Sequence, residues 1–171
     1  MRAPEKTSAP TERGPTELES ECLFCQRMAN PSSLKARLVF ENQAYHVSHQ
    51  LTEDGPTYLG SLLLQTKRHV TSLAELTDRE GQQLGTLIRQ TSRALNSCTP
   101  AAWTYAISFT EGYRHVHFIV TARYPNLPRE YVRLAVDDWP EAPRGTLAEV
   151  EHLASRLRVT MGRPSNLAPY I

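Results

Sequence analysis

The sequence lacks any long hydrophobic run, and no stretch approaches the roughly 20 apolar residues of a membrane helix. Residues 1–21 lack the apolar segment of a secretory signal peptide, so we expect a cytoplasmic protein that contacts no membrane. An excess of one charge is also missing, because 19 lysines and arginines stand against 18 aspartates and glutamates. The longest basic cluster is the pair Lys67-Arg68, whereas grooves that neutralise nucleic-acid phosphates usually need more, so we expect no nucleic-acid partner.

Cysteine is scarce, with three in 171 residues, so the cysteines cannot all pair with one another. A cytosol keeps thiols reduced, and we therefore interpret Cys22 and Cys25 as thiols or metal ligands rather than as a structural disulfide. Cys98 stands alone near the end of an expected helix, without a basic neighbour that would activate it. We interpret it as an inert, small hydrophobic residue.

Length and composition favour a single globular unit. A chain of 171 residues that is 40% hydrophobic suits one domain with one buried core. Residues 1–21 contain three prolines among Ser, Thr, Glu and Arg, and this composition cannot bury enough apolar surface to order itself. The sequence therefore predicts a flexible N-terminal arm at residues 1–21 and a single domain at residues 22–171 that includes a C-terminal helix.

The apolar pattern predicts strands followed by a helix, twice along the chain. Strand-like runs are expected at residues 38–40, 45–48, 61–65 and 103–109. The sequences Thr77–Glu80 and Thr146–Glu149 read as capping boxes that begin helices, and Pro100 ends the first of these helices. This order predicts an α+β domain in which an antiparallel sheet carries helices packed on one face.

The stretch Arg114–Val120 has the alternation of a strand and is the most informative part of the chain. Successive side chains of a strand point to opposite sides, so His115, His117 and Ile119 are predicted to line a site while the residues between them enter a core. The runs at residues 38–40 and 45–48, separated by Glu41-Asn42-Gln43, predict a hairpin. Two further histidines, His46 and His49, fall in or just after this hairpin, and we interpret them as exposed or edge residues.

This stretch resembles the signature of the histidine triad (HIT) family, in which His-x-His-x-His lies on a strand and the central histidine attacks the α-phosphorus of a nucleotide. Cys22-Leu-Phe-Cys25 resembles the Cys-x-x-Cys of a zinc-bearing branch of that family, and residues 60–70 resemble its strand that ends in Lys-Arg-His. The resemblance covers about residues 22–124. It implies a HIT-like antiparallel sheet with helices on one face, usually in a homodimer.

The resemblance also implies three sets of site residues. His117, as the second histidine of the motif, is implied to be the catalytic nucleophile that carries a covalent nucleotidyl intermediate. The implied substrate-binding residues are His115, Ile119 and Arg123, although Arg123 also fits a solvated arginine beyond a strand end. The implied ligands of a structural Zn²⁺ are Cys22, Cys25, His69 and His115, and the alternative is a reduced thiol pair beside two core histidines.

The chain departs from the family pattern at Ile119, which occupies the position of the third histidine. Ile119 cannot donate a proton or a hydrogen bond, so we predict slow hydrolysis. Two functions stay open: a nucleotide phosphohydrolase or nucleotidyl transferase that acts through His117, or a non-catalytic, re-purposed protein that binds a nucleotide or another small ligand. His117 favours the first function, and Ile119 together with Ala122 favours the second.

Overall fold

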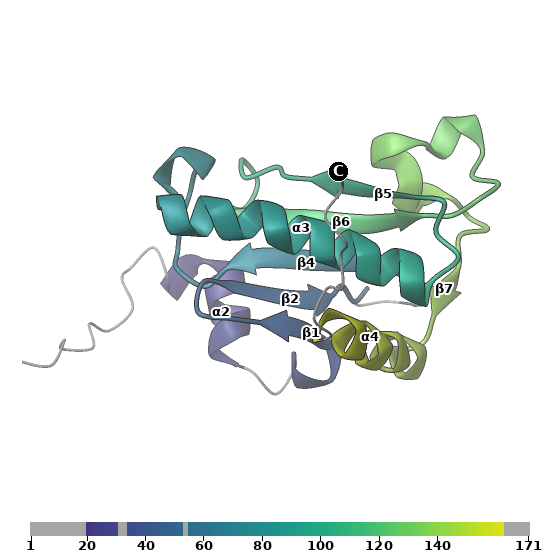
Figure 1. Cartoon of the computed structure of the whole chain (residues 1–171). Helices are drawn as coiled ribbons and strands as arrows, with labels where there is room; N and C mark the ends of the chain where they lie inside the picture. Colours follow the sequence, from purple (N-terminus) through teal and green to yellow (C-terminus); the bar gives the residue numbers. More distant parts are fainter. Residues whose placement is uncertain (1–19, 31–33, 53–54, 163–171) are drawn as a thin grey trace, which may run out of the picture.

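The computed structural model describes residues 20–30, 34–52 and 55–162, so the predicted arm at residues 1–21 lies outside the described residues except for Ser20 and Glu21. A five-stranded antiparallel sheet has the order β1-β2-β4-β6-β5 (Figure 1). Its strands are β1 (Leu38–Glu41), β2 (Tyr45–His49), β4 (Ser61–Thr66), β5 (Trp103–Ile107) and β6 (His117–Arg123). A two-stranded sheet pairs β3 (Thr57–Tyr58) with β7 (Arg144–Gly145). The α-helices are α2 (Leu23–Ala29), α3 (Asp78–Cys98) and α4 (Leu147–Met161).

Both long helices begin at the predicted capping boxes. The Thr77 hydroxyl accepts the Glu80 backbone N–H, and the Glu80 carboxylate accepts the Thr77 backbone N–H at 2.8 Å. Thr146 and Glu149 form the same reciprocal pair at the start of α4. These bonds satisfy N–H groups that have no partner within the first turn of a helix. Helix α3 ends at Cys98, two residues before Pro100, so both helix predictions are confirmed.

The predicted hairpin is present, and a single asparagine shapes its turn. Strands β1 and β2 pair antiparallel, and the Asn42 side-chain oxygen accepts the backbone N–H groups of Ala44 and Tyr45 at 2.9 and 2.8 Å. Asparagine favours turns because its side chain replaces a backbone acceptor in this way. Strand β4 is central in the sheet, as its continuous apolar run predicts.

Strand β6 begins at His117, three residues later than the predicted start at Arg114. Arg114 has a φ of 36°, which lies outside the extended region, and its N–H donates to the Thr110 carbonyl in a turn. The Val116 N–H donates to the carbonyl of Val70, beyond the end of β4. The alternation across residues 115–120 is nevertheless retained, because Val116 and Val120 are buried in the interior.

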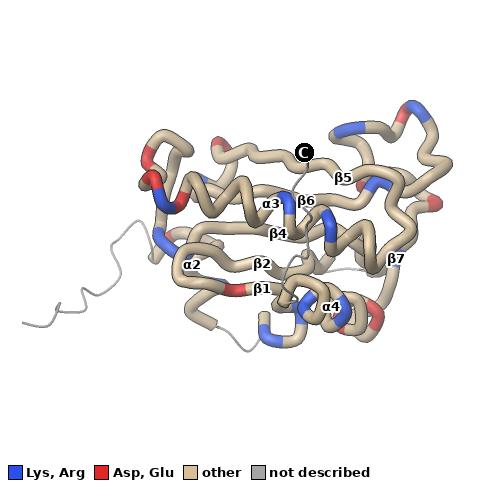
Figure 2. Tube along the Cα trace, viewed as in Figure 1, with Lys and Arg blue, Asp and Glu red and all other residues tan. Residues whose placement is uncertain are grey.

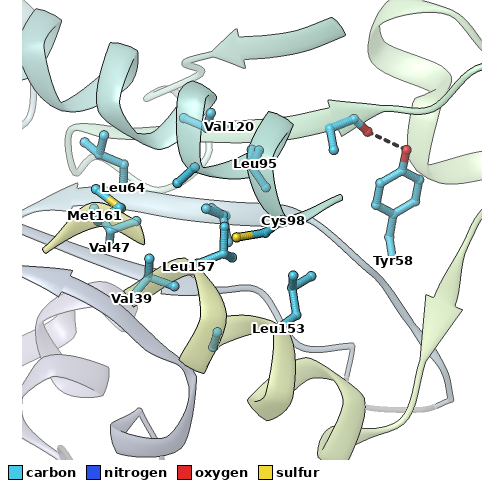
Figure 3. Close-up of a cluster of buried hydrophobic side chains, with 14 of the residues drawn as sticks. Val39, Val47, Tyr58, Leu64, Leu95, Cys98, Val120, Leu153, Leu157 and Met161 are labelled. Atoms are coloured by element: carbon cyan, nitrogen blue, oxygen red, sulfur yellow. Dashed lines mark hydrogen bonds between the residues drawn. The ribbon is translucent and has the colours of Figure 1, made fainter. Parts of the chain in front are cut away.

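Helices α3 and α4 cover one face of the sheet and form the main core with it (Figure 1). Apolar side chains of four strands meet Leu95 of α3 and Leu157 of α4 in this core (Figure 3). The strand residues labelled in that view are Val39, Val47, Leu64 and Val120. At one end of the core the Tyr58 hydroxyl donates to the Ala122 carbonyl at 2.6 Å. Cys98 is buried in this core, as predicted. The predicted α+β class with an antiparallel sheet is confirmed.

The opposite face of the sheet is also buried, although its residues are mainly polar. Short helix α2 reaches this face, where Cys22 and Phe24 pack against Leu63. Leu63 alternates with Leu62 and Leu64, which point into the main core. The buried polar residues of this face are His46, Ser48, Ser61, Gln65, His117 and Thr121. We call this surface the cavity face and the surface under α3 and α4 the core face.

Charged residues lie mainly on helices and loops. Figure 2 shows lysines and arginines interspersed with aspartates and glutamates, while strands β2 and β4 carry neither colour. Within the described ranges, none of the helices combines the length and the apolar composition required to cross a bilayer.

Candidate functional site

A cavity of about 380 Å³ lies on the cavity face, within the range of small-molecule sites. Strands β2, β4 and β6 contribute its floor, and α2 contributes one wall. Residues 49–52 and the short strands β3 and β7 contribute further lining residues. Two residues predicted from the sequence, His117 and Ile119, line this cavity together, whereas His115 and Arg123 are not among its lining residues in the described chain.

A backbone contact selects the tautomer of the His117 ring. Its Nδ1 lies 2.8 Å from the carbonyl oxygen of His115, two residues earlier on the same strand. A carbonyl oxygen can only accept, so Nδ1 carries the proton and the neutral ring keeps its lone pair on Nε2. Ser108 donates its hydroxyl to the His117 carbonyl at 2.7 Å and fixes the backbone there. The arrangement leaves Nε2 available as a nucleophile.

Two aromatic rings hold the imidazole of His117. The Phe24 ring lies 4.7 Å from the His117 ring with an interplanar angle of 34°, and Tyr113 meets Phe24 edge to face at 5.4 Å. Tyr113 also lies 6.2 Å from His117. Sequence reasoning did not assign a role to either aromatic residue. The available signal was the position of Phe24 between two candidate metal ligands, because a bound metal would anchor that segment.

The four predicted metal ligands come together in one cluster. The ligand atoms of Cys22, Cys25, His69 and His115 all lie within 4.8 Å of one another. The Sγ atoms of Cys22 and Cys25 lie 3.4 and 3.6 Å from Nδ1 of His115, and Cys25 Sγ lies 3.4 Å from Nδ1 of His69. These residues could hold a metal ion, and the structure places His115 in this cluster rather than on the cavity wall.

The hydrogen bonds of His115 prepare it for metal binding. Its Nε2 donates to the Thr66 carbonyl oxygen at 2.9 Å, so Nδ1 keeps a lone pair directed at the two sulfur atoms. Burial lowers the pKa of His115, which keeps the ring neutral, the form that binds metals. Backbone hydrogen bonds from Thr66 to Val116 and from Val116 to Val70 bring the ends of β4 and β6 together, and with them His69 and His115.

Arg123 lies at the opposite end of β6 from His117. Its guanidinium carbon is 4.3 Å from the centroid of the Trp103 ring, in a cation–π arrangement. Six residues of strand separate it from His117, a distance of roughly 20 Å. Arg123 is thus the last residue of the strand and not beyond its end, and it lies too far from His117 to contact a phosphate held there.

His46 and His49 are both buried, so the interpretation of exposed histidines is wrong. The reason is that β2 lies between β1 and β4, inside the sheet. His49 Nδ1 donates to the Gln50 carbonyl at 2.6 Å, and its Nε2 accepts the Gly60 N–H at 2.9 Å. Burial lowers the pKa of His49 to about 4, so the ring is a neutral structural link between two loops.

Several polar residues of the cavity carry no motif and were missed from the sequence. They include Arg27 of α2, Gln65 of β4, Asp137 and Arg144. Asp137 is exposed, but desolvation of its carboxyl group by the surrounding chain raises its pKa, and Arg144 donates to the Asp137 backbone carbonyl. Gln65 stands at the end of the run at residues 61–65, whose continuous apolar stretch is typical of a central strand. A glutamine in such a run was the one signal that could have identified it.

Comparison with solved structures shows the fold of histidine triad proteins. A HIT-like protein of Bartonella henselae aligns over 82% of this chain and 97% of its own, with a TM-score of 0.60 and 15% identity. A zinc-bound histidine triad family protein of Mycobacterium smegmatis aligns over 84% and 94%, with a TM-score of 0.59 and 14% identity. The diadenosine triphosphate hydrolase of Plasmodium falciparum aligns over 73% and 76%, with a TM-score of 0.53 and 14% identity.

The sequence comparisons give no match, either among protein-family models or among curated proteins. The similarity is therefore one of fold, at identities too low to carry residue roles across. The roles of individual residues depend on the geometry of this chain.

Proposed function

We propose that this protein is a nucleotidyl transferase or nucleotide phosphohydrolase that acts through a covalent intermediate on His117. The observation that carries the proposal is the 2.8 Å contact between His117 Nδ1 and the His115 carbonyl, on the wall of a cavity large enough for a nucleotide. In the neutral ring this contact places the proton on Nδ1, so the lone pair of Nε2 is available as a nucleophile without a separate base.

The first step is an in-line displacement at the α-phosphorus. The lone pair of Nε2 forms the N–P bond while the bond from phosphorus to the leaving group breaks, and the leaving group departs with that electron pair. The imidazole becomes positively charged, and its Nδ1–H bond to the His115 carbonyl stabilises that charge. Water then attacks the same phosphorus, the N–P bond breaks, and neutral His117 is restored with release of a nucleoside monophosphate and a proton.

The comparison with solved structures supports the choice of substrate class. One similar structure is a diadenosine triphosphate hydrolase, a protein that acts on a phosphoanhydride between nucleosides. The cavity of this chain combines apolar residues such as Leu23 and Leu63 with polar ones such as Ser61 and Gln50. Mixed linings of this kind suit a ligand with a flat base and a polar sugar phosphate.

Ile119 lowers the expected rate. It lines the cavity beside His117 and offers no hydrogen-bond donor to the phosphate or to the leaving group. The loss of one donor to a developing charge typically costs about 3 kcal/mol in the transition state, which is a rate factor of roughly a hundred. The proposed enzyme is therefore slow on ordinary HIT substrates.

We propose Zn²⁺ as the ion of the Cys22, Cys25, His69 and His115 cluster. A tetrahedral zinc with bonds of about 2.3 Å to sulfur and 2.0–2.1 Å to nitrogen separates the sulfur and nitrogen atoms by about 3.5 Å. The three sulfur–nitrogen separations of 3.4, 3.4 and 3.6 Å agree with this value. Four protein ligands close the coordination sphere, so the ion supplies structure and no catalytic chemistry.

A homodimer and a cytoplasmic location complete the proposal. Strand β5 is an edge of the sheet, and its Trp103 is 60% exposed, which supports pairing with a second copy. The described cysteines form no disulfide with one another, which suits a reducing compartment.

The test is the mass of the intact protein after mixing with nucleoside phosphoramidates and dinucleoside polyphosphates. We expect a nucleotidyl adduct on the wild type and none on His117→Ala. His152→Ala is the matched control, because His152 is exposed on α4 and its loss leaves the adduct in place. An adduct on His117→Ala contradicts the covalent mechanism. Nucleotide binding in calorimetry without any adduct on the wild type favours the non-catalytic alternative.

A further inference from the structure

Gln65 is a buried amide on the cavity wall with an unused hydrogen-bonding group. It is 3% exposed and lines the cavity, and its Nε2 has no partner among the residues that the structure describes. Buried polar groups in folded proteins are almost always paired, so each exception calls for an explanation. An amide that pairs only when a ligand is present is one such explanation.

The register of the sheet puts Gln65 directly opposite His117. Strands β4 and β6 pair antiparallel, with Gln65 facing His117 and Leu63 facing Ile119. Residues in register on one face have Cβ atoms about 4.5–5.5 Å apart, so their side chains share one patch of surface. Gln65 is therefore the cross-strand neighbour of the proposed nucleophile, on the same wall of the same cavity.

We propose that Gln65 binds the phosphoryl group on which His117 acts, by donating its side-chain N–H to a non-bridging oxygen. The proposal rests on the proposed function of His117 and names a second residue of that site. A phosphoryl group undergoing transfer spreads negative charge over its equatorial oxygens, and fixed donors beside it stabilise that charge. Gln65 gives and takes no proton, so the bonds formed and broken in the transfer are unchanged.

The neighbourhood of Gln65 explains why an amide is useful there. Ile119, which lies opposite Leu63 on β6, has no hydrogen-bond donor to offer to a phosphate. The neutral ring of His117 uses its only N–H on the His115 carbonyl. Gln65, the cross-strand neighbour of His117, carries side-chain N–H groups that could donate to a phosphoryl group at His117. The terminal amide turns easily about χ3, so its nitrogen can face the cavity when a phosphate is present.

His46 allows an alternative partner for the Gln65 amide, a buried water instead of a ligand. It faces Gln65 from the other side, across β2 and β4, and its Nε2 is also buried and without a partner among described residues. A single water between the two nitrogen atoms would satisfy both and would hold the amide away from the cavity. The experiment must therefore separate a ligand-binding amide from one that binds a buried water.

The test compares Gln65→Met and Gln65→Glu with the wild type, and Gln82→Met on the exposed surface of α3 serves as the matched control. Methionine keeps the length of the side chain without donors, and glutamate replaces the donors with a negative charge. We expect adduct formation from adenosine 5′-phosphoramidate to slow about tenfold in Gln65→Met and at least a hundredfold in Gln65→Glu. The thermal midpoint of Gln65→Met should be unchanged or higher, because no hydrogen bond is lost.

A second measurement uses the wild type alone. We expect AMP to shift the side-chain amide resonance of Gln65 in ¹⁵N NMR, the resonance being identified by its absence in Gln65→Met. Equal labelling of wild type and Gln65→Met overturns the role of Gln65 while the function of His117 stands. A resonance that responds to His46→Phe and not to AMP assigns the amide to a buried water and also overturns it. A wild type that forms no adduct and binds no AMP overturns the proposed function itself.

Discussion

The core face and the cavity face of the sheet are built from alternate residues of the same strands, yet their buried side chains differ in kind. Leu62 and Leu64 lie in an apolar cluster against α3 and α4, whereas Ser61 and Gln65 of the same strand lie on the cavity face. Both sets are almost fully buried. The buried cluster of the core face is apolar, although the buried Thr91 Oγ1 of α3 has no partner among the described residues. On the cavity face two buried side-chain nitrogen atoms, of His46 and Gln65, also have no partner among those residues.

The core face mainly stabilises the fold, whereas the cavity face carries the polar groups proposed to act on a ligand. Apolar burial on the core face provides the free energy that holds the sheet, while polar burial on the cavity face costs free energy unless each group is paired. A protein retains such a cost where a ligand can later provide the partner. Substitutions on the two faces should therefore change different measured quantities.

The largest expected effect comes from disrupting the proposed metal site, which would tie α2 to the cavity face. For Cys22→Ser we expect a loss of roughly 5 kcal/mol in unfolding free energy, below the about 10–16 kcal/mol of zinc-finger peptides because the sheet keeps its own core. Calorimetry measures the loss of stability. Elemental analysis measures the expected loss of about one zinc per chain. Cys98→Ala, in the main core, should keep the metal. Protein that is prepared without chelator and contains no metal contradicts the prediction.

Two adjacent leucines of β4 test the comparison most directly. Leu64→Ala should lower the unfolding free energy by about 2–5 kcal/mol, because Leu64 is fully buried in the main core and the substitution leaves a cavity there. Leu63→Ala should cost about 1 kcal/mol, since Leu63 packs on Phe24 beside an open cavity. Denaturant unfolding measures both values. Equal losses would show that the two faces contribute alike to stability.

Acid should act through His49, the last residue of β2. His49 has a pKa of about 4 in the folded protein and about 6.5 when unfolded. The unfolded chain therefore binds more protons between these values, and stability falls as the pH drops from 6.5 to 4, by up to about 3 kcal/mol from this residue. Unfolding measured across that range should show a smaller pH dependence in His49→Gln. An unchanged slope in that variant contradicts the assignment.

The smallest expected effect is a gain. Ile119→His places a donor beside the proposed nucleophile, and we expect hydrolysis of an adenosine phosphoramidate to rise about tenfold. Ile119→Val, which adds no donor, is the control and should stay at the wild-type rate. Wild-type turnover at rates typical of enzymes, around 1 to 1000 per second, would show that Ile119 does not impair the site.

Much of the fold follows from local sequence patterns. The capping boxes at Thr77 and Thr146 define the starts of both long helices, and the alternation from His115 to Val120 separates the two faces of the sheet correctly. These predictions succeed because the signals lie within a few residues of one another. The start of β6 was misplaced because the backbone of Arg114 adopts a positive φ, which no residue pattern around Arg114 indicates.

The site depends on contacts between distant segments, and the sequence identified only part of it. The four candidate metal ligands are recognisable from the motifs that resemble the zinc-bearing HIT branch, and the structure brings them together. Gln65 and Phe24 acquire their positions from the register of β4 with β6 and from the docking of α2. His46 and His49 were misinterpreted because β2 is buried by the order of the strands, and the local sequence around these histidines does not determine that order.

The origins of the four cluster residues have a consequence for how a metal would bind. His69 and His115 lie beside the ends of paired strands, while Cys22 and Cys25 lie at the N-cap and in the first turn of the short helix α2. The two thiolates therefore reach the ion as a tethered ligand, at an effective concentration set by how often α2 is docked. Metal affinity thus reports the docking equilibrium of α2. A competition titration with a chelator would detect a loosened Phe24 contact before any change in the melting of the sheet.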